Sequence, residues 1–290
     1  MVETPPASRT AVLVCQGRAA AHGLVATERF SDPTALPLLR ADEREAVVWV
    51  RDGRAPKEWR TRVAYETVKA ITELMVPRTV AIDDAVRARP GQQVVILGAG
   101  LDGRAWRMPE LADVAVFEVD QPASQQDKRS RAAVLSGRPP TYVPVDFRTD
   151  DLSRALAAAG HLGDRPTTWV WEGVVPYLTP AEVEATVGAV AACSARGSRL
   201  VVNFQLPVPF LKLGFLLGRA LSRSAGQTSV FTREPWRSTW TPAAMAELLA
   251  RHGFTVTADL NILDVAESLP VPIWHRRSLA QSQVQVADRD

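Results

Sequence analysis

The residues best suited to chemistry lie where predicted strands end, and the first of them form a glycine-rich turn. Gly98, Ala99 and Gly100 directly follow the apolar run 94–97, where a buried strand would turn into a helix. Glycines let the backbone approach a ligand closely, and the new helix N-terminus presents unpaired N–H groups. This arrangement predicts a binding site for a nucleotide-like ligand.

Acidic residues end the next predicted strands. Carboxylates accept hydrogen bonds from ribose hydroxyls, an adenine amino group or an ammonium. Ligands of doubly wound sheets bind outside the C-terminal strand ends, so we expect these acids to meet at one site. The strand ends in question are Glu118-Val119-Asp120, Asp146-Phe147 and Glu172-Gly173.

The glycine turn alone does not identify the ligand. Gly98, Gly100 and Gly103 spell G-x-G-x-x-G, and Glu118 and Asp120 follow about 20 positions later, as in the dinucleotide fingerprint. The same letters are compatible with NAD or FAD, with S-adenosylmethionine (SAM), or with a turn that binds nothing. The choice must come from the rest of the chain.

The elements that would position these residues alternate between strand and helix after a helical start. Expected helices before the first strand are 10–21, 41–50, 58–75 and one from Pro77 to the Pro90-Gly91 break. Expected strands are 94–97, 114–120, 141–147, 167–173, 199–204 and 254–260. Expected helices between them are 121–135, 152–159, one capped by Thr179 that ends at Gly197, and 241–253. Pro144 indicates a strand near the sheet edge.

This pattern predicts an α/β fold with a largely parallel sheet wound on both faces. We divide the chain into an N-terminal helical cap, 1–90, and an α/β domain, 91–290, with an insertion at 205–240. The apolar stretch 209–221 in that insertion is interpreted as a lid over a substrate pocket. A packing helix or a membrane-surface helix would also explain it.

Composition narrows the function classes. The 290 residues are 46% hydrophobic and 23% charged with a net charge of +2, which is ordinary for a globular protein and predicts no nucleic-acid partner. No apolar run reaches the length of a membrane span, and the first residues lack a signal core, so we expect a cytoplasmic enzyme. Cys15 and Cys193 have no metal-ligand spacing, and we expect free thiols and no metal.

Several longer motifs are similar to those of the leucine carboxyl methyltransferase family. They are L-G-A-G-L-D-G-R-A-W-R, F-E-V-D-Q-P, V-D-F-R-T-D-D-L and W-E-G-V-V-P-Y-L-T. The branch that the chain most resembles is that of bacterial SAM-dependent methyltransferases, which includes polyketide O-methylating enzymes. The resemblance implies a class I methyltransferase fold: a seven-stranded, mostly parallel sheet, helices on both faces and an N-terminal helical cap.

The resemblance also implies a role for each motif residue. The SAM methionine carboxylate would be bound by Arg78, and its amino end would lie near Glu172. The glycine turn, Gly98, Ala99 and Gly100, would line the methionine and ribose. The ribose hydroxyls would bind Asp120, with Gln121 beside it, and the adenine would bind Asp146 and the backbone of Phe147. Asp102 and Arg104 match the family motif and could have a role that the motif specifies. Alternatively, they would form an ion pair that stabilises the loop.

Gly103 departs from the family pattern, which usually has a small hydroxyl residue there. The dinucleotide fingerprint is therefore interpreted as coincidental. Region 205–240 also differs from the family, so we expect it to determine substrate choice.

The resulting prediction is a SAM-dependent O-methyltransferase that acts on a carboxylate or hydroxyl of a small acidic or phenolic metabolite, as in polyketide-like natural-product metabolism. Glu172 and Tyr177 are the candidate catalytic residues nearest the expected pocket. A carboxylate acceptor needs no base, whereas a phenol could use a histidine; the histidines are His22, His161, His252 and His275. The alternatives are an NAD-dependent oxidoreductase and a non-catalytic SAM-binding module, and a homodimer is possible.

Overall fold

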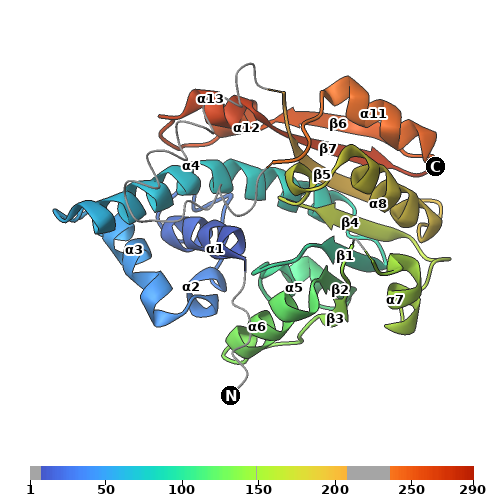
Figure 1. The fold of residues 1–290 in the computed structure, drawn as a ribbon, viewed down its shortest axis with the longest axis horizontal. Helices are drawn as coiled ribbons and strands as arrows, with labels where there is room; N and C mark the ends of the chain where they lie inside the picture. The colour runs from blue at the N-terminus through green and yellow to red at the C-terminus, as the bar shows by residue number, and fades with distance from the viewer. Residues whose placement is uncertain (1–7, 148, 208–235) are drawn as a thin grey trace.

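A seven-stranded sheet forms the centre of the molecule in a computed structural model that describes residues 8–147, 149–207 and 236–290 (Figure 1). The strand order is β3-β2-β1-β4-β5-β7-β6, and β7 alone runs antiparallel to its neighbours. The strands are β1 (Gln93–Leu97), β2 (Ala115–Asp120), β3 (Thr141–Pro144), β4 (Thr167–Trp171), β5 (Arg199–Gln205), β6 (Thr255–Asn261) and β7 (Ser282–Asp288). The six strands named from the sequence are present, and β3 with its Pro144 is an edge strand, as predicted.

Helices cover both faces of the sheet because the central strands bury both of their sides. Along β1 and β4, Val95 and Trp169 pack into one hydrophobic cluster, and Val94 and Val170 pack into another. The first cluster is completed by α7 (Leu152–Ala158), α8 (Pro180–Ala192) and α11 (Pro242–Arg251), and the second by α4 (Trp59–Ala88), α12 (Ile262–Glu267) and α13 (Arg276–Ala280). This two-faced burial confirms the predicted doubly wound fold.

The helices of the sheet domain follow the predicted order. They are α5 (Arg104–Arg107), α6 (Pro122–Ala132), α7 (Leu152–Ala158), α8 (Pro180–Ala192), α11 (Pro242–Arg251), α12 (Ile262–Glu267) and α13 (Arg276–Ala280), with 3-10 turns η1 (Pro109–Leu111) and η2 (Val175–Tyr177). The predicted capping box of α8 is present, since Thr179 and Glu182 bond reciprocally.

The first three helices lie together on one side of the sheet (blue, left in Figure 1), and the fourth (teal) runs from them to the sheet. They are α1 (Arg9–Ala21), α2 (Ala35–Leu38), α3 (Ala41–Arg51) and the long α4 (Trp59–Ala88). The prediction of two helices that meet near Pro77 was wrong, because α4 is continuous and contains this proline. A proline removes one backbone donor, and here Met75, Val76 and Val80 are buried around it, so packing outweighs the loss.

Helix α4 also links the predicted cap to the sheet. Its first half packs on α1 and α3, while Ile82 and Val86 near its end belong to the core under the sheet. The predicted apolar helix 209–221 lies outside the described residues. None of the described helices combines the length and apolar character needed to cross a membrane.

Candidate active site

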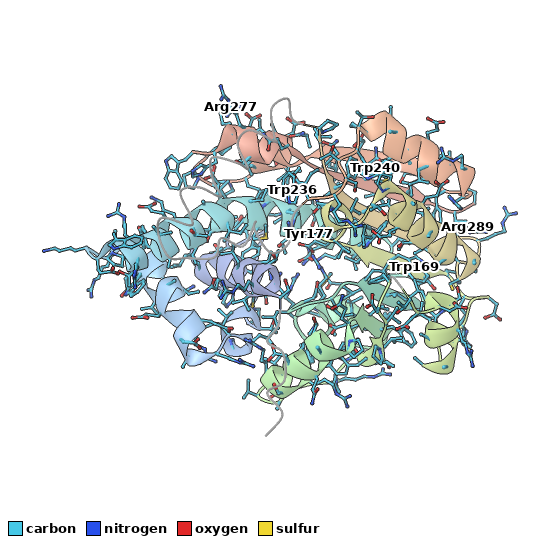
Figure 2. All side chains as sticks on the ribbon, viewed as in Figure 1. Trp169, Tyr177, Trp236, Trp240, Arg277 and Arg289 are labelled. Carbon is cyan, nitrogen blue, oxygen red and sulfur yellow. The ribbon has the colours of Figure 1, made fainter. Side chains whose placement is uncertain are left out.

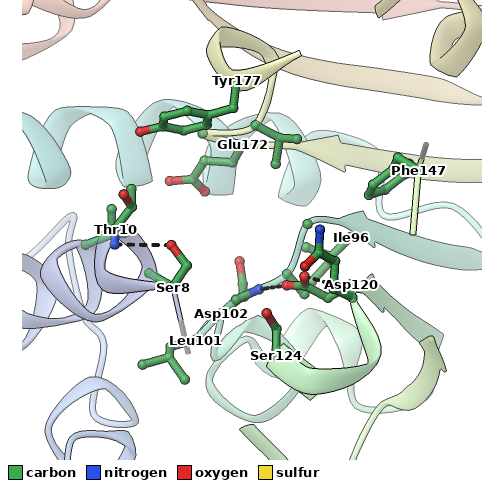
Figure 3. Close-up of a pocket in the computed structure, with 18 of the residues that line it drawn as sticks. Ser8, Thr10, Ile96, Leu101, Asp102, Asp120, Ser124, Phe147, Glu172 and Tyr177 are labelled. Atoms are coloured by element: carbon green, nitrogen blue, oxygen red, sulfur yellow. Dashed lines mark hydrogen bonds between the residues drawn. The ribbon is translucent and has the colours of Figure 1, made fainter. Parts of the chain in front are cut away.

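A cavity of about 400 Å³ opens at the C-terminal ends of the parallel strands (Figure 3). Every site residue predicted from the sequence lines it: Arg78, Gly98, Ala99, Gly100, Asp120, Gln121, Asp146, Phe147, Glu172 and Tyr177. The fold therefore brings together segments that span almost 100 positions of the chain. Their individual roles in ligand binding stay predictions.

The glycine turn after β1 has a backbone that only glycine adopts easily. Gly98 and Gly100 have φ of +65° and +49°. A Cβ on Gly98 would lie 2.3 Å from Cγ2 of Val174, so the site excludes a side chain on steric grounds as well. The N–H groups of Gly98 and Ala99 donate to the carbonyl of Val119 at 2.8 and 3.1 Å, which ties the turn to the end of β2.

Asp120 is the acid that reaches the glycine turn. Its Oδ2 accepts from the Gly100 N–H at 2.6 Å and its Oδ1 from the Gln121 N–H at 2.7 Å (Figure 3). Burial raises the pKa of Asp120, and these two hydrogen bonds oppose that shift. The carboxylate thus holds the loop in place and still borders the cavity.

Glu118, the other acid in the fingerprint spacing, has a different environment. Its side chain is fully buried beside Lys128, with Oε2 2.5 Å from Nζ, and it does not line the cavity. Burial raises the pKa of Glu118 to about 7, against the opposing effect of Lys128. Only Asp120 is thus placed to meet a ligand.

Glu172 at the end of β4 is held between two guanidinium groups. Nε of Arg78 donates to Oε1 at 2.8 Å, and Nη1 of Arg104 lies 2.8 Å from Oε2. Burial alone would favour the neutral acid, but the charges of Arg104 and Arg78 dominate and lower the pKa of Glu172. Glu172 is therefore an ionised carboxylate, suited to holding a cation and poorly suited to removing a proton.

The ion pair between Asp102 and Arg104, one of the two interpretations of these motif residues, is present. Arg104 is almost fully buried and also donates from Nε to Oδ1 of Asp83 at 2.8 Å. Because Arg104 in turn contacts Glu172, the ion pair braces the glycine loop against the end of β4. Asp102 lines the cavity as well.

The third fingerprint glycine, Gly103, serves packing. It does not line the cavity, and a Cβ there would lie 1.8 Å from Oγ1 of Thr34, a residue just before α2. Its backbone conformation is an ordinary one, with φ of −115°. The glycine therefore lets the N-terminal helices approach the loop, which agrees with the interpretation that the fingerprint is coincidental.

Sequence reasoning missed three charged residues of the cavity lining, which come from α1, from α8 and from the C-terminal end of the insertion 205–240. Arg18 of α1 is buried in the lining, where Nε donates to Asp32 at 2.8 Å and Nη2 to the carbonyl of Leu101 at 2.7 Å. Arg237 and Glu182 border the other end. No local signal distinguishes Arg18 or Arg237 from the other arginines of the chain.

Tyr177 of η2 projects toward α1, above Glu172 and across from Thr10 (Figures 2 and 3). None of the histidines belongs to the cavity lining found in the described part of the chain. His161 instead packs against Phe117 and Trp169, and His275 bonds to Glu73 from the C-terminal segment.

The lining fits a cationic nucleoside such as SAM. Its glycine turn leaves space that a side chain would fill, and the carboxylates of Asp120, Asp146 and Glu172 face one cavity from three strand ends. Such oxygens can accept from hydroxyl, amino and ammonium groups. Glu172 is an ionised acceptor in this lining, with Arg78 and Arg104 offsetting its charge.

The chain is similar in sequence to known methyltransferases. The leucine carboxyl methyltransferase family model matches residues 11–191. A candidate SAM-dependent methyltransferase of Mycolicibacterium vanbaalenii is 35% identical over 201 residues, which cover 67% of this chain and 65% of that protein. One from Mycolicibacterium smegmatis is 35% identical over 213 residues, which cover 70% and 67% respectively.

A solved structure shows the same fold over the whole chain. A candidate methyltransferase from Thermobifida fusca superimposes with a TM-score of 0.53 and 15% identity, covering 100% of both chains. With the seven-stranded sheet described above, this likeness establishes the class I methyltransferase fold. The family match extends over more than half of the chain and includes the whole cavity lining except Ser8, Thr10 and Arg237. The chain belongs to the leucine carboxyl methyltransferase family.

Proposed function

We propose that this protein is a SAM-dependent methyltransferase that methylates a carboxylate oxygen of a small metabolite. The observation that carries the proposal is the convergence of the glycine turn with Asp120, Asp146 and Glu172 on one cavity. Membership of the family supports it, as do the names of the mycobacterial relatives. SAM is the cofactor, and when bound it supplies a methyl group on a good sulfur leaving group.

The residues of the chain bind and orient the cofactor. Asp120 accepts from the ribose hydroxyls with the lone pairs that its backbone bonds leave over, and Asp146 with Phe147 holds the adenine. Glu172 accepts from the ammonium of the methionine end. Arg78, whose Nε is already bonded to Glu172, offers its remaining N–H groups to the carboxylate. With these roles, the methionine end of the cofactor would lie on the Tyr177 side of the cavity.

The ionisable side chains that line the cavity favour a methyl acceptor that is already ionised. Against the effect of burial, Arg104 and Arg78 lower the pKa of Glu172, and hydrogen bonds from Thr179 lower that of Glu182. Burial would also raise the pKa of Asp102, but the charge of Arg104 holds it well below its usual range. Such carboxylates are weak bases near neutral pH. A carboxylate acceptor needs no base, so the chain has only to orient it and exclude water.

The proposal also places the reaction in natural-product metabolism, on the resemblance of the motifs to polyketide O-methylating enzymes. Tyr177 orients the acceptor from η2, and the remaining apolar lining from Val14, Val174 and Leu178 shields the reacting atoms from water.

Calorimetric titration with SAM, S-adenosylhomocysteine and NADH tests the cofactor assignment. We expect the first two ligands to bind and NADH to give no heat; NADH binding without SAM binding would refute the assignment. Transfer of a radiolabelled methyl group is then measured to matched carboxylic acids and phenols. Methylation of the phenols alone would disprove the acceptor class, and SAM binding without any transfer would favour a non-catalytic module.

A further inference from the structure

We propose that Arg237 recognises a second anionic group on the methyl acceptor, so that the preferred acceptors are small dicarboxylic acids. The inference rests on the proposed function and names the substrate class of the same site. It follows from how Arg237 is placed, from what its guanidinium contacts, and from the state of the other arginines in the lining.

The main chain around Arg237 is fixed against the turn that carries Tyr177. The N–H of Arg237 donates to the carbonyl of Pro176 at 2.6 Å, and Oγ of Ser238 donates to the carbonyl of Val175 at 3.1 Å. Both acceptors belong to η2, the segment directly after the strand end with Glu172. Arg237 is therefore anchored at the acceptor end of the cavity, away from the adenosine-binding acids.

The other arginines of the lining are committed to buried acids. Arg18 pairs with Asp32, and Arg78 pairs with Glu172; each of these four side chains is less than 10% exposed. Removing either arginine from its partner would leave a buried charge without compensation, which is costly. In the proposed function the remaining N–H groups of Arg78 bind the carboxylate of the cofactor, so neither arginine could be drawn away to a substrate anion without that cost.

Arg237 has an exchangeable partner instead. Its Nη1 lies 3.1 and 3.4 Å from the two oxygens of Glu182, and the side chains are 45% and 26% exposed. An ion pair this exposed contributes little to stability. A bidentate bond to a desolvated substrate carboxylate is stronger. An anionic acceptor can thus take over part of the guanidinium with little loss.

The negative charge of Glu182 means that an anionic acceptor needs Arg237 in order to bind. Its Oε2 accepts from the Thr179 N–H at 2.6 Å in the capping box of α8, so the carboxylate is held at the cavity edge. Without Arg237 its charge would repel an anionic acceptor. The pair therefore selects methyl acceptors by their charge. Removing the charge of Arg237 should weaken the preference for anionic acceptors, and removing the charge of Glu182 should strengthen it.

The test uses the full chain loaded with radiolabelled SAM and a panel of short aliphatic and aromatic diacids. Each diacid is matched with its monoamide, which has nearly the same shape and one charge less. We expect the wild-type protein to favour diacids by about tenfold or more in kcat/KM, the size of one charge-assisted hydrogen-bonded pair. Arg237→Ala should abolish this preference mainly through KM.

Glu182→Gln separates recognition from folding. Glutamine retains the capping-box bond but removes the competing charge, so the preference for diacids should rise about two- to threefold, in keeping with a weak exposed pair. Arg251→Ala is the matched control: Arg251 is also about half exposed and pairs with an α8 acid, Glu184, at 3.3 Å, but it does not line the cavity. It should leave the preference unchanged.

Several results would overturn the inference while leaving the proposed function intact. They are equal use of diacids and monoamides by the wild-type protein, a preference that survives Arg237→Ala, or methylation only of monoacids. Failure to methylate any member of the panel, with SAM bound normally, would count against the inference and against methyl transfer to a carboxylate together. Loss of SAM binding in the wild-type protein would instead remove the proposed function itself.

Discussion

Nε of Arg78 lies 2.8 Å from Oε1 of Glu172, and both side chains are less than 10% exposed although they are 94 positions apart in the chain. Arg104 holds the other oxygen of the same carboxylate. The pairing joins α4, the glycine loop and the end of β4 at the floor of the cavity. It also decides the chemistry of Glu172, because two cations keep this acid ionised.

Glu172→Gln should lower the free energy of unfolding at pH 7 by about 3 kcal/mol, since two buried guanidinium groups lose their shared anion. The lowered pKa of Glu172 means that its contribution is present above the ordinary value of 4.5 and is lost as the pH falls through the folded-state value. The difference between wild type and variant in urea unfolding should therefore shrink from pH 6 to pH 3. A difference that stays constant over this range would contradict the assignment.

Asp120→Ala should weaken S-adenosylhomocysteine binding about 100-fold, the loss expected when hydrogen bonds to a charged acceptor disappear. The measurement is calorimetric titration. Circular dichroism verifies that the variant is still folded although the glycine loop has lost its bond to Asp120. Asp113→Ala, an exposed acid that precedes β2 and does not line the cavity, is the control. Near-normal affinity of the Asp120 variant would show that the carboxylate only braces the loop.

Gly98→Ala should destabilise the protein by about 3 kcal/mol, because the left-handed backbone and the contact with Val174 act together. Gly160→Ala provides a matched glycine: its φ is +94°, but nothing lies within 4 Å of a Cβ there, so about 1 kcal/mol of backbone strain is expected. Adding Val174→Ala to Gly98→Ala should recover the steric part. If the two changes were simply additive in chemical denaturation, the steric explanation would be wrong.

Gly103→Ala should cost about 1–3 kcal/mol from overpacking against Thr34, with no backbone strain. Thr34→Ala should partly restore the stability of that variant, although by itself it loses the 2.6 Å bond from Oγ1 to Asp32. In the double variant the affinity for S-adenosylhomocysteine should be near that of wild type. A 100-fold loss there would mean that Gly103 contacts the cofactor after all.

Local sequence patterns are enough to predict the doubly wound fold and the position of the site. The apolar run 94–97 is buried on both faces as expected, and Thr179, Pro180 and Glu182 start a helix where the capping signature predicts one. Parallel strands end at one edge, so residues that follow different strands must meet there. For this reason the strand pattern by itself groups Asp120, Asp146 and Glu172 at a single site.

The tertiary structure decided what depends on contacts between distant segments. Pro77 predicts a helix break locally, but packing on both sides keeps α4 continuous. Nothing near Arg78 or Glu172 in the sequence indicates that they pair. The reason for a glycine at position 103 is likewise visible only in the structure, where Thr34 leaves no space for a side chain. The placement of Arg18 and Arg237 at the cavity likewise follows from three-dimensional packing, because an arginine carries no local mark of the partner it will meet.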